Sequence, residues 1–237
     1  MYDLHSHCLP NLDDGAKNVE MSLEMLKCAK AQGVNTVCAT PHCITDMDEG
    51  IVSFLEKRQK SYEKLASQMQ NNDEYPRLLL GAEVYLGCDM SDFEHLKELC
   101  YQGTDYILLE MPSGFEPSEL SEWIYNISIK GLKPVIAHID RCPDYEEIID
   151  ELEGTDVVFQ VNASQFLTMT GRHLLKKLFK KHSKYFVSSD MHNMSSRACN
   201  IGEARKICDK KFPKLSKLLF CEGAAHIIEN KAFIEGV

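Results

Sequence analysis

The first residues of the chain place two histidines where they could bind one metal ion. His5 and His7 follow a short apolar run, and side chains two positions apart on an extended strand lie on the same face. The acidic turn Asp13-Asp14-Gly15 follows within a few residues. Imidazoles and carboxylates so close together are typical of a metal site, although a polar N-terminus with solvated histidines would look the same. The rest of the chain decides between these interpretations.

Further candidate ligands stand where predicted strands end. We predict strands over residues 34–39, 77–85, 106–110, 134–139, 156–162 and 185–190, and only the strand ending at Asn162 lacks a metal-binding residue at or beside its end. In a parallel barrel the C-terminal strand ends meet at one mouth. We therefore predict that the following residues form one cluster with the first two histidines: His42, Glu83, Glu110, His138, Asp190 and His192. The remaining histidines fall in or near predicted helices, and we expect them to be structural or solvated.

The elements that position these residues alternate regularly. Apolar residues at helical spacing predict helices over residues 18–32, 49–69, 119–130, 145–152, 172–181 and 197–210, another up to about residue 101, and a last one within 215–234. Strands that alternate with helices predict a parallel sheet covered by helices, and the length suits a (β/α) barrel. Periodicity alone does not separate a barrel from an open doubly wound sheet. No low-complexity linker interrupts residues 1–237, and we expect a single domain.

Composition excludes several classes of protein. The net charge of −10 argues against nucleic-acid binding. No apolar run is long enough to cross a bilayer and no signal peptide is recognisable, so we expect a cytoplasmic protein that does not insert into membranes. The ten cysteines are spread singly without a CxxC pair, which indicates free thiols in a reducing compartment. We expect Cys8 and Cys43, which follow candidate ligands, to point away from the metal.

The ligand types favour a transition-metal centre for phosphate chemistry. Imidazoles combined with carboxylates suit Mn, Fe or Zn better than Mg or Ca. The candidate ligands are too many for one ion and suffice for two or three, and multinuclear sites hydrolyse phosphate esters. Arg141 and Arg197 follow two of the ligands in loops that should overhang the mouth, where a guanidinium group could grip phosphate oxygens. The alternative for each arginine is an ordinary surface contact.

Six motifs in order resemble the polymerase-and-histidinol-phosphatase (PHP) superfamily. Within it, the chain is most similar to the manganese-dependent bacterial protein tyrosine phosphatases that regulate capsule and exopolysaccharide synthesis. The motifs are His5-Ser-His7 with Asp13-Asp14-Gly15, Ala39-Thr40-Pro41-His42, Gly81-Ala82-Glu83, Leu109-Glu110-Met111-Pro112, Ala137-His138, and Ser189-Asp190-Met191-His192-Asn193. One departure concerns the loop after His138, where the chain has Ile-Asp-Arg-Cys and the family often has Pro-Glu-Arg-Tyr.

The resemblance implies a distorted seven-stranded (β/α) barrel, the PHP fold, with three metal ions, most commonly Mn²⁺, although Fe, Co or Zn would also fit. It divides the ligands among the ions as follows: His5, His7, Glu83 and Asp190 for the first; Glu83, Glu110 and His138 for the second; Asp14, His42 and His192 for the third. Arg141 and Arg197 would bind the substrate phosphate and take part in catalysis with the metal ligands His138 and Asp190. Asp13 becomes a candidate for supporting a ligand.

The implied function is hydrolysis of phosphotyrosine in proteins by a metal-bridged hydroxide, with a cognate bacterial tyrosine kinase as partner. The chain has no Cys-x5-Arg signature, so thiolate-based phosphatase chemistry is not expected. The nearest alternative is a small-molecule phosphomonoesterase of the same superfamily, such as one acting on histidinol phosphate. An amidohydrolase would usually place a bridging lysine where this chain has Glu83 or Glu110. A non-enzymatic metal-binding barrel would have no need of the two arginines.

Overall fold

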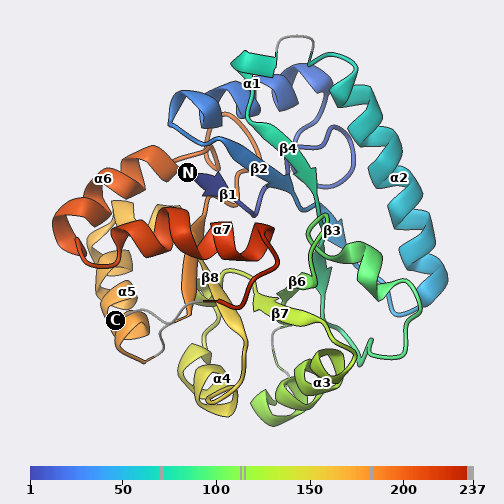
Figure 1. Cartoon of the computed structure of the whole chain (residues 1–237), viewed down its shortest axis with the longest axis vertical. Coiled ribbons are helices and arrows are strands. Elements are labelled where there is room, and N and C mark those ends of the chain that lie inside the picture. Colours follow the sequence, from blue (N-terminus) through green and yellow to red (C-terminus); the bar gives the residue numbers. More distant parts are fainter. Residues whose placement is uncertain (70–71, 113, 115, 182–183, 234–237) are drawn as a thin grey trace.

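All paired strands of the molecule run parallel in the computed structural model, which describes residues 1–69, 72–112, 114, 116–181 and 184–233. Figure 1 shows the strands at the centre and the helices around them. The strands are β1 (Tyr2–Asp3), β2 (Thr36–Ala39), β3 (His42–Cys43), β4 (Arg77–Leu80), β5 (Glu83–Tyr85), β6 (Tyr106–Glu110), β7 (Lys133–Ile136), β8 (Val158–Asn162) and β9 (Tyr185–Ser188). The helices are α1 (Val19–Ala31), α2 (Asp48–Ala66), α3 (Pro117–Ile129), α4 (Tyr145–Glu151), α5 (Met169–Lys181), α6 (Ile201–Lys211) and α7 (Gly223–Ile228).

The strands form two sheets that are joined by continuous chain. One sheet has the order β1-β2-β4 and the other the order β3-β5-β6-β7-β8-β9. Only the two residues Thr40 and Pro41 separate β2 from β3, and only Gly81 and Ala82 separate β4 from β5. The nine strands of the described residues are therefore seven successive segments, two of which are kinked. This accounts for the seven strands predicted from the sequence.

Backbone hydrogen bonds join the first segment to the last, just beyond the ends of β1 and β9. The Asp190 amide donates to the His5 carbonyl at 2.9 Å, and the His7 amide donates to the Met191 carbonyl at 2.9 Å. Ser6 and Met191 form an isolated parallel bridge between them. The seven segments thus follow one another around a distorted α/β barrel, and the junction lies among the predicted metal ligands.

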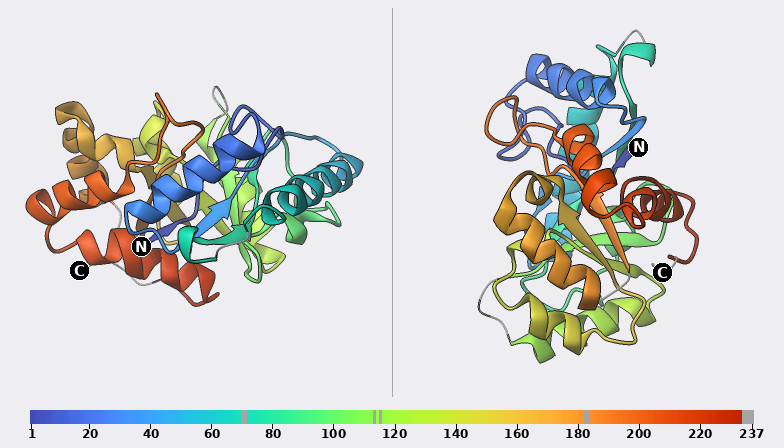
Figure 2. Two further views of the ribbon diagram at one scale, coloured as in Figure 1. Left: turned by 90° about the horizontal axis from the view of Figure 1, so that it is seen from above. Right: turned by 90° about the vertical axis from the view of Figure 1, so that its left-hand side faces the viewer.

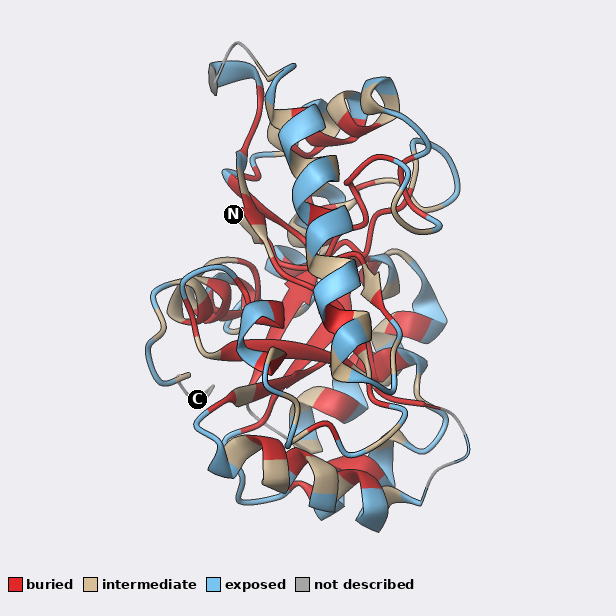
Figure 3. Ribbon diagram, turned by 90° about the vertical axis from the view of Figure 1, so that its right-hand side faces the viewer, coloured by how far each residue is buried: buried red, intermediate tan, exposed pale blue. Residues whose placement is uncertain are grey.

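Side chains of the strands alternate between the inside of the barrel and the helical layer. On β6, Ile107 and Leu109 belong to the large apolar core beneath the helices, whereas Tyr106 and Leu108 belong to a smaller cluster inside the barrel. Figure 3 shows this burial along the strands and the inner sides of the helices. The period of two places Glu110 on the inward face with Tyr106 and Leu108, at the C-terminal end of the strand.

Helix α7 covers the end of the barrel that lies opposite the predicted metal ligands. Its residues Ala224 and Ile227 pack in the inner cluster, and Asn230, just after the helix, accepts a hydrogen bond from the Asp105 amide that precedes β6. Figure 1 shows α7 crossing in front of the strands, and Figure 2 shows it from two further sides. The barrel is therefore closed where the strands begin and open where they end. Among the described residues, none of the helices combines the length and the apolar composition that spanning a bilayer requires.

Local sequence signals set most helix boundaries as predicted. Asn18 caps α1 by accepting a hydrogen bond from the Met21 amide at 2.8 Å. Gly33 follows that helix with a φ of 86°, a left-handed conformation that glycine adopts at little cost. The predicted strand over residues 34–39 and the predicted helices over 49–69, 119–130, 145–152 and 172–181 are each present, with ends shifted by a few residues.

One predicted element is wrong, and another is present but begins later than predicted. The helix expected up to about residue 101 is absent, and a 3-10 turn over Leu96–Leu99 takes its place. In the preceding loop the Asp89 side chain accepts a hydrogen bond from the Ser91 amide, a local contact that competes with a helix. Helix α6 begins at Ile201 rather than Arg197. The Asn193 side chain accepts a hydrogen bond from the Arg197 amide and so holds residues 193–197 as a loop. The end of the last predicted helix, Ile234, lies outside the described residues.

The kink at Gly81 depends on a buried arginine of α2. Arg58, which is only 8 % exposed, donates to the Gly81 carbonyl at 2.6 Å and to the Glu98 carbonyl at 3.0 Å. A Cβ atom at Gly81 would lie 3.2 Å from atoms of Cys38, Thr40 and Tyr101, so the backbone here is closely surrounded. Arg58 therefore ties α2 to the kinked segment that delivers Glu83.

We predict that Arg58→Met lowers the free energy of unfolding by about 1–3 kcal/mol, because it leaves the buried Gly81 carbonyl and the partly buried Glu98 carbonyl without this donor. Urea denaturation followed by circular dichroism measures the change. Lys57→Met, on the exposed side of the same helix, is the matched control and should leave the unfolding midpoint nearly unchanged. Equal midpoints for the two variants would show that the Arg58 contacts do not stabilise the kink.

Candidate metal centre

Glu83 lies at the centre of the predicted ligand cluster. Its Oε2 atom is 3.2 Å from His5 Nε2, 3.1 Å from His7 Nε2 and 3.1 Å from His42 Nδ1. Its Oε1 atom is 2.8 Å from His138 Nε2. The side chain is 1 % exposed, so this carboxylate is surrounded by imidazole nitrogens and shielded from water. The sequence places these residues on four separate segments, and the fold brings them together.

Asp190 and Asp14 extend the cluster toward the mouth. Asp190 Oδ1 is 3.5 Å from nitrogens of His5, His7 and His192. Asp14 Oδ1 is 3.3 Å from His192 Nε2 and 3.5 Å from His42 Nε2, and the Asp14 side chain is mostly exposed. Buried ligands and an exposed rim are what an open catalytic site requires.

Glu110 completes the set. Its carboxylate oxygens lie 3.7 Å from His42 Nδ1 and 3.7 Å from His138 Nε2. All nine predicted ligands therefore lie in one continuous cluster.

The donor atoms are close enough to hold metal ions. Within the described residues, the cluster contains four overlapping groups whose donor atoms all lie within 4.8 Å of one another: His7, Asp14, His42 and His192; His5, His7 and Asp190; His5, Glu83 and His138; His42, Glu83 and Glu110. Three buried atoms facing this region, His42 Nδ1, Glu83 Oε2 and His192 Nε2, make no hydrogen bond. Such atoms are costly unless a cation or water satisfies them. The donor set fits a metal centre.

Two imidazole rings are held by partners outside the cluster. His7 Nδ1 is 2.7 Å from Asp13 Oδ2, and His5 Nδ1 is 3.1 Å from Gln160 Oε1. Each contact engages one ring nitrogen and leaves Nε2 facing Glu83, the orientation that a metal-binding histidine needs. Asp13 contacts His7 and lies outside the groups of clustered donors, in line with the supporting role expected for it.

Gly15 allows the acidic turn to approach His7. A Cβ atom at this position would lie 2.1 Å from the His7 carbonyl oxygen and 2.5 Å from its Cβ, closer than atoms can pack. The Gly15 amide also donates to Asp13 Oδ1 at 2.9 Å. The glycine in the Asp13-Asp14-Gly15 motif therefore permits both aspartates to reach the site.

Sequence reasoning missed the contribution of β8. Gln160 Oε1 also accepts a hydrogen bond from the His138 amide at 2.6 Å, and Gln160 Nε2 donates one to Asn162 Oδ1 at 2.9 Å. Asn162 Nδ2 then donates to Asp190 Oδ2 at 3.2 Å. The strand without a predicted ligand thus links three ligands through amides. Alternation from the buried Val158 would have placed 160 and 162 on the inward face, so the signal was present in the sequence.

Two ligands adopt unusual backbone conformations. His138 has a φ of 29° and Asp190 a φ of 54°, both in the left-handed region that non-glycine residues rarely occupy. Behind Asp190, the buried Asp3 accepts hydrogen bonds from the Ser189 amide and hydroxyl. Backbone strain of this kind persists where the surroundings fix it, commonly at functional sites.

Burial and neighbouring charges shift the pKa values of the cluster in both directions. Burial alone would raise the pKa of Asp190, but His5, Arg141, His7 and Arg197 lower it to about 2. Burial would lower the pKa of His7, but Asp13 and Glu83 raise it to about 10. Burial and the neighbouring His7 lower the pKa of His192 to about 4, so its imidazole is neutral at pH 7 and able to bind a metal ion.

The cysteines next to the ligands do not join the cluster. Burial raises the pKa of both the Cys8 and the Cys43 thiol to about 12. Neither residue belongs to a group of potential metal ligands among the described residues. The expectation that both point away from the site agrees with this arrangement, and neither thiol is poised as a nucleophile.

Both predicted arginines reach the mouth of the site. Arg141 Nη2 lies 2.6 Å from Asp190 Oδ2. Arg197 Nη2 lies 3.0 Å from both Asp190 oxygens, and its Nη1 is 3.6 Å from Asp14 Oδ2. Arg141 is 44 % exposed and Arg197 33 % exposed. Two guanidinium groups therefore converge on one carboxylate at the rim of the ligand cluster, where an anionic group could replace that contact.

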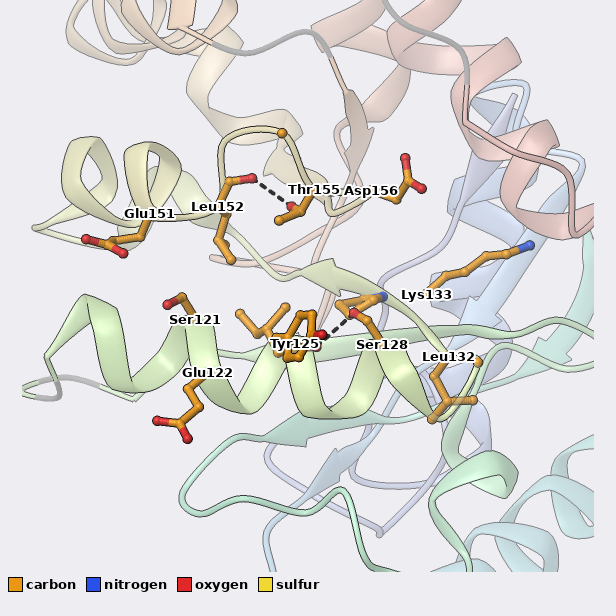
Figure 4. A pocket seen from close by; sticks show the side chains of 14 residues that line it. Ser121, Glu122, Tyr125, Ser128, Leu132, Lys133, Glu151, Leu152, Thr155 and Asp156 are labelled. Carbon is orange, nitrogen blue, oxygen red and sulfur yellow. Dashed lines mark hydrogen bonds between the residues drawn. The ribbon is translucent and has the colours of Figure 1, made fainter.

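A second hollow, of about 710 Å³, lies between α3 and α4 (Figure 4). Lys133 and Asp156, which line it, lie where β7 and β8 begin, at the end of the barrel away from the ligand cluster. The hydroxyls of Ser128 and Thr155 are bonded to nearby backbone carbonyls. None of the predicted site residues lines this hollow, which is therefore separate from the metal centre.

Comparison with known proteins gives a consistent result. The profile of the family described as "Capsular polysaccharide synthesis, CpsB/CapC" matches residues 1–229. Tyrosine-protein phosphatase CpsB of Streptococcus agalactiae is 30 % identical, with 97 % of this chain and 99 % of that protein covered. Tyrosine-protein phosphatase YwqE of Bacillus subtilis is 27 % identical, with 98 % and 92 % covered.

A crystal structure from work on YwqE of Bacillus subtilis and CpsB of Streptococcus pneumoniae, described as "unique metal-dependent tyrosine phosphatases", matches with a TM-score of 0.83 at 25 % identity. The match covers 99 % of this chain and 97 % of the chain in the crystal structure. A histidinol phosphate phosphatase from Lactococcus lactis shares the fold, with a TM-score of 0.53 at 11 % identity over 89 % and 93 % of the two chains. The family profile, and the relatives that match over nearly their whole length, agree with the resemblance found in the sequence. The chain therefore belongs to the CpsB/CapC family.

Proposed function

We propose that this protein is a metal-dependent phosphatase that hydrolyses phosphotyrosine in proteins. The observation that carries the proposal is the convergence of nine metal-binding side chains and two arginines at one mouth. Asp190 connects the two parts, because it lies 3.5 Å from the nitrogens of three histidines and within 3.0 Å of both guanidinium groups. The names of the relatives, tyrosine-protein phosphatases of Streptococcus and Bacillus, support the substrate class.

Three ions, most commonly Mn²⁺, would occupy the cluster. The first would be held by His5, His7, Glu83 and Asp190, the second by Glu83, Glu110 and His138, and the third by Asp14, His42 and His192. The groups of clustered donors support the first and third sets in outline, with His7 also beside the third set. They divide the second set into two groups, Glu83 and His138 with His5, and Glu83 and Glu110 with His42. When bound, such ions lower the pKa of a coordinated water from 15.7 toward about 7 and so supply the nucleophile.

The arginines bind and orient the phosphate. Arg141 and Arg197 exchange their contact with Asp190 for the equatorial oxygens of the phosphoryl group, which they can grip in a bidentate fork. They also stabilise the charge that develops there in the transition state, an effect that preorganised donors commonly provide. The leaving group is a tyrosine phenolate with a parent pKa near 10, so departure needs little help from an acid. No covalent phosphoenzyme is required.

The partner would be a tyrosine-phosphorylated protein, namely a cognate bacterial tyrosine kinase of capsule or exopolysaccharide synthesis. The proposed enzyme is a single domain over residues 1–237 that acts in the cytoplasm. The mouth supports a protein substrate in one respect: Arg141 and Asp14 are accessible at the rim, so a phosphorylated side chain on a larger chain can reach them.

We predict that EDTA abolishes phosphatase activity toward a phosphotyrosine peptide and that Mn²⁺ restores it, because the ions would supply the nucleophile. Hydrolysis is followed by phosphate release, and histidinol phosphate is assayed beside the peptide. Activity that persists in the chelator would contradict the metal mechanism. Faster turnover of histidinol phosphate than of the peptide would contradict the proposed substrate.

We predict that Arg141→Lys lowers kcat/KM for the phosphotyrosine peptide by about 100-fold, because a lysine keeps the charge but cannot form the bidentate contact. Metal content should stay unchanged. Arg77→Lys is the matched control, since this exposed arginine begins β4 at the far end of the barrel. A rate within about twofold of the wild-type value for Arg141→Lys would remove Arg141 from the catalytic machinery.

A further inference from the structure

Positive charge is concentrated in one stretch of this acidic chain. Residues 172–217 contain 13 of the 26 Lys and Arg side chains but only three of the 36 Asp and Glu side chains. Residues 89–156 show the opposite bias, with 17 acidic and four basic side chains. Although the net charge is −10, the basic and the acidic side chains are therefore concentrated in different stretches of the chain.

The basic stretch forms one surface because α5 and α6 pack beside each other. Both helices contact the 3-10 turn over Ala163–Leu167. Phe179 of α5 and Phe212, at the end of α6, are in ring contact with centroids 5.6 Å apart. Figure 1 shows the two helices on one side of the barrel, with α2 on the opposite side. Figure 2 shows α5 and α6 together on one face.

We call this surface the basic face and define it by the following seven lysines: Lys176, Lys177 and Lys180 of α5, Lys206, Lys210 and Lys211 of α6, and Lys214 just after it. All seven are exposed. None forms an ion pair with a carboxylate of the described residues, whereas the neighbouring Lys181 and Arg205 are paired with Asp150 and Asp209. The charge of the basic face is thus left uncompensated within the described part of the chain.

The composition of the basic face does not suit a protein partner. Protein interfaces are depleted in lysine and rely on aromatic or arginine anchors in apolar surroundings. Among the exposed large hydrophobic residues of the described chain, only Met169 belongs to α5 or α6, and it stands at the first position of α5, at the end away from Lys180. The two arginines of these helices are engaged, Arg172 with the Phe166 carbonyl and Arg205 with Asp209.

A nucleic acid also fits poorly. The basic face offers no exposed aromatic ring on which bases could stack. Flexible lysines without apolar anchors suit the diffuse negative charge of an anionic membrane surface. Each lysine near such a surface contributes about 1 kcal/mol of attraction.

We propose that the basic face binds the anionic headgroups of a phospholipid membrane surface. The contact is electrostatic and peripheral, with no inserted segment. Lys180 and Lys181 end α5 just before β9 begins at Tyr185, so this side of the surface is remote from the ligand cluster at the ends of the strands. The membrane-bound protein therefore keeps the mouth of the metal centre accessible.

The test is co-sedimentation of the metal-loaded full chain with vesicles. We expect binding to phosphatidylcholine vesicles that contain phosphatidylglycerol, and none to phosphatidylcholine alone. Raising the salt from about 0.1 M to about 1 M shortens the Debye length from about 10 Å to about 3 Å and should release the protein. The variant K176Q/K177Q/K180Q should bind at least about tenfold more weakly.

The matched control is K57Q/K60Q/K64Q, which removes three exposed lysines from α2 on the opposite side of the barrel. It should bind the mixed vesicles like the unchanged chain. Both variants should hydrolyse a soluble phosphotyrosine peptide at the original rate if the proposed activity is correct, but vesicle binding does not depend on that activity. Lack of binding to the mixed vesicles would overturn the proposal. If both variants bound the mixed vesicles equally weakly, or if the unchanged chain bound neutral and mixed vesicles equally well, the proposal would also be overturned. Binding to RNA without binding to vesicles would overturn it as well.

Discussion

The structure depends on placing two carboxylates where water cannot reach them. Glu83 and Asp190 are 1 % and 3 % exposed, and moving an isolated carboxylate out of water is very costly. Imidazoles from four chain segments and two guanidinium groups surround these charges. Three nitrogen and oxygen atoms in this region still lack hydrogen bonds. Such a cluster calls for added positive charge, which bound metal ions would supply.

The parallel barrel provides this arrangement in a simple way. Its strands deliver their C-terminal ends to one mouth, and the junction of the first and last segments lies among the ligands, where Asp190 donates its amide to His5. The far end is closed by α7, which packs against the inner apolar cluster. Residues at the mouth are therefore free to serve chemistry, while stability comes from the opposite end and from the layer beneath the helices.

Much of this could be predicted from the sequence, because parallel strands and metal ligands leave local signals. The ligands at the strand ends, the two arginines and the helix boundaries around Asn18 and Gly33 followed from spacing. The division of residues 77–85 into two strands did not, since the kink at Gly81 depends on Arg58 from a distant helix. Gln160 and Asn162 were missed because amides do not look like ligands, although they hold three of them. Strand alternation places residues 160 and 162 inward, but the contact of Arg58 with Gly81 depends on tertiary structure that a linear pattern does not contain.

The most direct test of the account is the metal content of the purified protein after dialysis against metal-free buffer, measured by inductively coupled plasma mass spectrometry. We predict three transition-metal ions per chain, with Glu83→Gln retaining fewer because Glu83 lies between two of the proposed sites. One ion or none per chain in the unchanged protein would contradict the claim that the nine ligands act as a multinuclear centre.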